Sequence, residues 1–171
     1  MSFPLVGNPS STEKNDSGQA RMTGINKKKE DTMAEKILIV DDEPDMLKLL
    51  SMILKEKTPY DITTTNNPLE ALELVKKGAF DLVISDLKMP GLDGIELIDA
   101  VKKVNEDIPI IIITAYGTVE SATEAMQKGG FDFITKPFRK EQILFTIDKA
   151  LKWLNVQREN KMLKERLKKQ E

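Results

Sequence analysis

The sequence predicts an α/β protein whose main part is one doubly wound domain, a parallel sheet with helices on both faces. Two observations predict this class. From residue 36 onward, apolar segments of strand length alternate with amphipathic helical segments. Several of the apolar segments are continuous rather than alternating, which is typical of strands buried on both faces. A third observation adds an extended C-terminal helix, because the last helical pattern continues without glycine or proline to residue 171.

Five segments are predicted strands, at residues 36–40, 60–65, 82–85, 109–113 and 131–135. The second is the most polar, which fits the edge of a sheet. Because helical segments separate consecutive strands, we expect the flavodoxin-like (βα)5 three-layer sandwich with the strand order 2-1-3-4-5. In such a sheet, ligands bind outside the carboxyl ends of the strands.

Helical spacing predicts four helices between these strands. The first spans residues 44–57 and the second 67–78, each with a proline near its start. The third begins at residue 94, and the glycine pair at 129–130 ends the fourth. Their apolar positions are, in order, Leu47, Leu50 and Leu54; Leu69, Leu72 and Val75; Leu97, Ile98, Val101 and Val104; and Val119, Ala122 and Met126. The fourth helix has a thin apolar stripe, so it is either an ordinary surface helix or an element with two arrangements.

The fifth helix begins near Glu141 and changes its apolar face part of the way along. Residues expected to pack on the sheet are Ile143, Ile147, Ala150 and Leu151. Beyond them, steps of three and four residues place Trp153, Asn160 and Leu167 at a positions and Val156 and Leu163 at d positions of a coiled coil. A single Asn at an a position favours a parallel pair. We therefore expect 153–171 to be a dimerising linker, with an amphipathic, solvated tail as the alternative.

Composition restricts the classes of function. The chain has 171 residues and a net charge of −2, so the domain has no electrostatic basis for non-specific nucleic-acid binding. No apolar run reaches the roughly 18 to 20 residues that cross a bilayer. The absence of cysteine excludes a disulfide scaffold and makes the cytoplasm the expected location. The absence of histidine means that a phosphohistidine must come from another molecule.

Residues 1–33 are rich in small polar residues and lysine and show no periodicity, so we expect a disordered leader or tag. A basic arm at 27–29 that touches nucleic acid or membrane is the alternative. The folded domain is expected to span residues 34–152.

Polar side chains follow the ends of four predicted strands. Asp41 and Asp42 follow the first, Asp86 the third, Thr114 the fourth and Lys136 the fifth. Converging carboxylates repel one another unless a cation neutralises them, and oxygen ligands without histidine or cysteine select Mg²⁺. A carboxylate can also attack phosphorus, and the acyl phosphate that forms needs Mg²⁺, a lysine and hydroxyl donors around it.

Four segments resemble the receiver domain of bacterial two-component response regulators over residues 34–152. They are ILIVDDE (37–43), VISDLKMPG (83–91), IITA (112–115) and TKPF (135–138). The resemblance implies that Asp86 accepts a phosphoryl group from a phosphohistidine of a sensor histidine kinase. It also implies that Asp41, Asp42, Asp86 and the backbone carbonyl of Lys88 hold Mg²⁺.

The same resemblance implies a switch. Lys136 would contact the phosphoryl oxygens, and Thr114 would move to hydrogen-bond them. Phe133 matches the aromatic switch position, although it lacks the hydroxyl that some members carry. The movement would bias the face formed by the fourth helix, the fifth strand and the fifth helix, and with it dimerisation.

Residues 114–126 and 130–138 are most similar to those of NtrC-type enhancer-binding activators. That family joins its receiver to an AAA+ ATPase and a DNA-binding domain, and this sequence contains neither, so any contact with DNA would need a region absent from this chain. The chain is thus expected to be a receiver with a linker, or a stand-alone regulator acting through protein contacts. We expect no enzymatic turnover, because Lys88 occupies the position where an aspartyl-phosphate phosphatase carries its second acid. A receiver-like module that is never phosphorylated is a further alternative.

Overall fold

The computed structural model describes residues 33–170, which contain one five-stranded parallel sheet. The strands are β1 (Lys36–Val40), β2 (Asp61–Thr65), β3 (Leu82–Ser85), β4 (Ile110–Thr114) and β5 (Asp132–Thr135). Their spatial order is β2-β1-β3-β4-β5, which confirms the predicted flavodoxin-like topology, with strand bounds within one residue of those expected. The expectations for residues 1–32 fall outside the described part of the chain.

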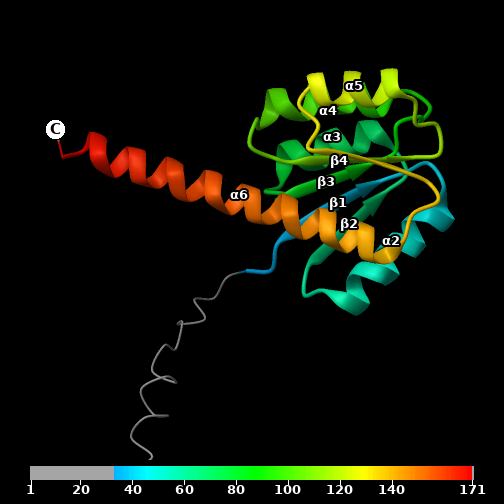
Figure 1. Ribbon diagram of the computed structural model, residues 1–171, viewed down its shortest axis with the longest axis horizontal. Coiled ribbons are helices and arrows are strands. Elements are labelled where there is room, and N and C mark those ends of the chain that lie inside the picture. The colour runs from blue at the N-terminus through cyan, green and yellow to red at the C-terminus, as the bar shows by residue number, and fades with distance from the viewer. Residues whose placement is uncertain (1–32, 171) are drawn as a thin grey trace, which may run out of the picture. The chain divides into compact units, whose positions relative to one another are not determined.

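Helices cover both faces of the sheet. They are α2 (Pro44–Lys57), α3 (Pro68–Lys77), α4 (Gly94–Val104), α5 (Val119–Gln127) and α6 (Lys140–Lys168). Helices α3, α4 and α5 lie on one face, and α2 and α6 lie on the other (Figure 1). The sandwich therefore has the three layers that the sequence predicts.

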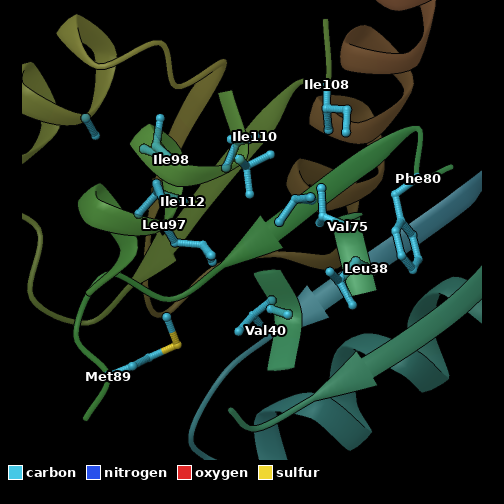
Figure 2. Packing of buried hydrophobic residues seen from close by; sticks show 14 of the residues in the cluster. Leu38, Val40, Val75, Phe80, Met89, Leu97, Ile98, Ile108, Ile110 and Ile112 are labelled. Atoms are coloured by element: carbon cyan, nitrogen blue, oxygen red, sulfur yellow. The ribbon is translucent and has the colours of Figure 1, made fainter. Parts of the chain in front are cut away.

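Two apolar clusters, one on each side of the sheet, hold the layers together. In β1, Leu38 and Val40 belong to the cluster beneath α3, α4 and α5, while Ile37 and Ile39 belong to the cluster beneath α2 and α6. Figure 2 shows the first cluster, in which side chains from three strands meet those of the helices. Each such side chain contributes about 1.5 to 3 kcal/mol through burial. This two-sided burial explains the continuous apolar runs.

The inner faces of α3 and α5 differ in part from those predicted, whereas α4 buries the predicted Leu97, Ile98 and Val101 and exposes only Val104. Four residues predicted to mark the apolar faces are exposed instead: Leu69, Val104, Val119 and Met126. In α3 the buried positions are Pro68, Ala71 and Val75, and in α5 the buried residue is Ala125. Small residues occupy these inward positions. The prediction relied on the spacing of large apolar side chains and therefore assigned the buried face to a neighbouring side of the helix.

The last helix, α6, is 29 residues long and has two parts. Its first part buries the expected Ile143, Ile147, Ala150 and Leu151 against the sheet, followed by Leu154. The second part continues well past the sheet, as Figure 1 shows in orange and red. Within residues 33–170, no helix combines the length and the apolar character that a membrane crossing requires.

Candidate functional site

The carboxyl ends of β1 and β3 bring the predicted acidic residues together. Parallel pairing places Val40 beside Ser85, so the residues that follow them, Asp41 and Asp86, are neighbours. Both carboxylates are buried, with 2% and 4% of each residue exposed. One carboxylate oxygen from each of Asp41, Asp42, Glu43 and Asp86 lies within 4.8 Å of the others.

Lys136 enters this cluster from the end of β5. Its Nζ lies 3.1 Å from Asp41 Oδ2 and 3.4 Å from Asp86 Oδ2, and its side chain is 10% exposed. Burial lowers the pKa of Lys136, but the charges of Asp41, Asp86 and Glu43 and the hydrogen bond to Asp41 outweigh it and raise the pKa above its ordinary value. The ammonium group therefore stays charged and partly neutralises the acids.

The ionised form of Asp41 remains unfavourable despite the nearby lysine. Burial raises the pKa of Asp41 above its ordinary value, although the Glu43 amide and Lys136 act in the opposite direction. The Glu43 amide donates to Asp41 Oδ1 at 2.9 Å. A second cation would relieve the repulsion that one lysine leaves, and the donors are carboxylate oxygens, which are the ligands that Mg²⁺ prefers. The residue set fits that ion.

Asp86 is held in place by its own loop. The Leu87 amide donates to Asp86 Oδ1 at 2.7 Å, so Oδ2 is the oxygen nearer Lys136. The loop then folds back, and the Gly94 amide donates to the Leu87 carbonyl at 2.7 Å. A Cβ at Gly94 would overlap the main chain of Asp86 and Leu87, so this close approach needs glycine.

A cleft of about 650 Å³ opens over Asp86. Residues that line it are Asp42, Glu43, Asp86, Lys88, Met89, Pro90, Asp93 and Tyr116. Lys88 Nζ lies 4.6 Å from the centre of the Tyr116 ring, and this cation–π pair stands at the cleft. The sequence motifs point to the Lys88 carbonyl but not to Tyr116, whose only sequence signal is its place two residues after Thr114.

Thr114 ends β4 and Phe133 lies in β5, and among the hydrogen bonds of the described residues none joins either of them to Asp86. The Thr114 hydroxyl is buried and accepts from the Tyr116 amide at 3.2 Å, so it is engaged by its own loop. Phe133 is partly buried against the cluster beneath α3, α4 and α5. Gly117, three residues after Thr114, lies against Phe133, because a Cβ there would come within 2.9 Å of Phe133 Cε1. The loop after β4 is therefore packed directly on the proposed switch residue, a contact that the sequence did not reveal.

The predicted dimer seam lies along the second part of α6. Val156, Leu163 and Leu167 are exposed by 53%, 55% and 65%, and Asn160 is also exposed. Trp153 differs from them, because its ring packs on Phe131 of the same chain with centroids 5.7 Å apart. The apolar stripe is thus present and open, and its first member also serves the domain.

The sequence matches the family described as the response regulator receiver domain over residues 37–148. Among curated relatives, the transcriptional regulatory protein GlrR of Escherichia coli is 41% identical over 115 residues, which is 67% of this chain and 26% of GlrR. The chain therefore spans about a quarter of the length of that relative. The sporulation initiation phosphotransferase F of Bacillus subtilis is 40% identical over 119 residues, which is 70% of this chain and 95% of that protein.

Solved structures agree with these matches. The beryllofluoride-activated NtrC4 receiver domain dimer has a TM-score of 0.67 at 36% identity, covering 70% of this chain and 98% of that one. NtrC-type regulators thus stand among the relatives in both comparisons, as the sequence motifs predict. With its topology, its acidic cluster and the family match over 37–148, this chain belongs to the response regulator receiver domain family.

Proposed function

We propose that this chain is a phosphorylation-controlled switch that accepts a phosphoryl group on Asp86 from a phosphohistidine of a sensor histidine kinase. The observation that carries the proposal is the buried Asp86 carboxylate beside Asp41 and Asp42, with Lys136 Nζ 3.4 Å from its Oδ2. Such a carboxylate is placed to act as a nucleophile rather than as a surface charge.

In the proposed reaction, an Asp86 carboxylate oxygen attacks the donor phosphorus in line. The P–O bond forms as the P–N bond breaks, and the electron pair stays on the donor imidazole. Lys136 stabilises the charge that gathers on the phosphoryl oxygens. Asp41, Asp42, Asp86 and the Lys88 carbonyl would hold Mg²⁺, whose charge offsets that of the acids and the phosphate. We propose self-modification of this kind and no turnover of a separate substrate.

The output is proposed to be a change in association. Thr114 would leave the Tyr116 amide for a phosphoryl oxygen, and Phe133 would follow through the loop at Gly117. This would bias the face of α5, β5 and α6 and the exposed stripe of α6. The GlrR relationship favours an output in transcription activation through regions outside this chain.

A stand-alone regulator is a second candidate, because the Bacillus subtilis relative is matched over 95% of its length. Sedimentation of the free and beryllofluoride-treated chain distinguishes the two. A change in association state supports the dimer switch, and a monomer in both states supports the stand-alone regulator.

The phosphoacceptor is tested by intact mass after incubation with Mg²⁺ and acetyl phosphate. We expect one added phosphoryl group on the wild type and none on Asp86→Asn. The matched control is Asp45→Asn, which removes an exposed carboxylate from the first turn of α2 and should be modified like the wild type. Equal modification of Asp86→Asn and wild type would rule out Asp86 as the acceptor.

A further inference from the structure

Three residues that precede strands, at the end of the sheet opposite the acidic cluster, contact the part of α6 from Trp153 onward. Asp81 immediately precedes β3, and its Oδ1 accepts from Arg158 Nη2 at 2.7 Å. Asp107 lies shortly before β4, and its Oδ2 accepts from Lys161 Nζ. The third contact is the ring pair of Phe131, just before β5, and Trp153. We call Asp81, Asp107 and Phe131 the docking edge.

Contacts other than those to α6 hold the two acids of the docking edge in position. Asp81 uses its other oxygen, Oδ2, to accept from the Lys36 amide at 2.8 Å, so its side chain is tied to the start of β1. The loop that carries Asp107 is held by Lys102, whose Nζ donates to the carbonyls of Glu106 and Ile108 at 3.0 and 2.8 Å. Fixed partners reduce the entropy lost when an ion pair forms, which favours these pairs over ordinary surface pairs.

The two ion pairs also span more of the sequence than the other exposed pairs of the domain, of which Lys149–Asp132 joins residues 17 apart. Lys152–Asp148 and Lys103–Asp99 join residues one turn apart in one helix. Arg158 and Asp81 are 77 residues apart, and Lys161 and Asp107 are 54 apart. These two pairs therefore connect the projecting part of α6 to the body of the domain.

The angular positions of residues around α6 show which side of the helix faces the domain and which side faces away. At about 100° per residue, Arg158 and Lys161 lie within about 40° of the buried Leu154, all on the side of the domain. On the same count, Val156, Leu163 and Leu167 lie about 180° to 220° from Leu154. Val156, Leu163 and Leu167 therefore point away from Arg158 and Lys161, while Trp153, which packs on Phe131, lies between the two directions.

We infer that the docking edge is a binding surface for the chain's own linker helix, and that its two ion pairs fix which face of the linker is presented to a second copy of the chain. The contacts require no phosphoryl group and no metal. The inference therefore stands independently of the proposed phosphorylation and can fail or succeed without it.

The absence of cysteine permits a direct distance measurement. Dye pairs at Lys48→Cys on α2 and Lys168→Cys at the end of α6, diluted into excess unlabelled protein, report the position of the linker within one chain by single-molecule energy transfer. We expect a single narrow distribution that broadens when Arg158→Gln and Lys161→Gln are combined. These variants leave the Asp81–Lys36 bond and the loop of Asp107 intact.

The matched control combines Lys152→Gln and Lys164→Gln, which removes the same charge from the same helix without touching the docking edge. The control should keep the narrow distribution. If both double variants broaden it equally, or neither does, the ion pairs do not orient the linker and the inference is wrong.

Amide exchange with a charge swap gives a second, independent test. In Asp107→Lys, amides of residues 158–168 should exchange about two- to fivefold faster, and adding Lys161→Asp should restore their protection. Amides of β3 and β4 serve as the check that the domain remains folded. A swap that restores nothing while β3 and β4 stay protected would overturn the inference.

Discussion

At the scale of residues, the site is defined by an imbalance of charge. Four carboxylates lie together and Lys136 pairs with three of them, those of Asp41, Glu43 and Asp86. Burial raises the pKa of Asp41 in spite of the opposing effect of Lys136. A folded-state pKa above the unfolded value means that the ionised form costs stability. That cost is present above the raised pKa and is lost as the pH falls through that pKa toward the ordinary pKa of an aspartate, 3.8.

Asp41→Asn is therefore expected to stabilise the metal-free protein at pH 7, by about 1 kcal/mol, because it removes a carboxylate whose charge burial disfavours while Lys136 keeps Asp86 and Glu43 as partners. Thermal unfolding in the presence of a chelator measures the effect. The gain should shrink as the pH is lowered toward 4. Added Mg²⁺ should raise the melting temperature of the wild type and not of the variant. A variant less stable than the wild type at every pH would contradict this account.

Gly117 offers a second test at this scale. A Cβ there would lie 2.5 Å from Thr135 Cγ2 and 2.9 Å from Phe133 Cε1, so Gly117→Ala should cost about 1 to 3 kcal/mol. Denaturant unfolding measures this loss. Adding Thr135→Ser removes the nearer methyl group and should recover part of it. If the second substitution recovers nothing, the clash lies elsewhere.

Much of the site follows from the sequence alone. Asp41, Asp42, Asp86, Thr114 and Lys136 each stand at or just after the carboxyl end of a predicted strand, and parallel strands bring such positions to one edge. The contacts of Tyr116 and Gly117 do not follow, because they depend on how one loop folds over another strand. No periodicity or motif in the sequence specifies that packing.

At the scale of elements, α5 is the least anchored helix of the domain. Only Ala125 is fully buried among its nine residues, whereas α4 buries Gly94, Leu97, Ile98 and Val101. Since Thr114 and Gly117 precede α5 and β5 follows it, the loosely packed helix lies where the proposed switch would act. The sequence predicts the thin stripe correctly but assigns its direction to Val119 and Met126, because an alanine face carries a weak apolar signal.

We expect the amides of α5 to exchange at least about tenfold faster than those of α4 in the unphosphorylated protein, because local opening of α5 exposes little apolar surface. Hydrogen exchange followed by mass spectrometry measures both helices in one sample. Beryllofluoride should slow exchange in α5 more than in α4. Equal protection of the two helices would exclude α5 as a low-stability element.

At the scale of the whole molecule, the exposed stripe of α6 governs the expected association. Leu163→Lys places a charge in the middle of the proposed seam and should weaken any dimer by at least about tenfold in Kd. Met162→Lys is the matched control, because Met162 is similarly exposed on the same helix but lies off the stripe. Sedimentation equilibrium over a range of concentrations measures both. Equal effects of the two substitutions would place the interface elsewhere.

Topology was the most predictable property of the molecule, since alternating elements and a single polar strand leave few arrangements of the sheet. The attachment of α6 was the least predictable. Asp81 and Asp107 are surface acids in loops, and their partners Arg158 and Lys161 are distant in sequence, so only the folded chain reveals that they meet.

The ion pairs of α6 also determine how much of the helix extends beyond its last contact with the domain. With both pairs formed, the last attachment is at Lys161 and seven residues extend to Lys168, about 10 Å of helix. If the pairs open, the last attachment moves back to the buried Leu154, and the free arm doubles to 14 residues, about 21 Å. A tilt of α6 by a given small angle then displaces its carboxyl-terminal end about twice as far. The two ion pairs therefore determine how far a small rotation of the helix moves that end relative to the domain.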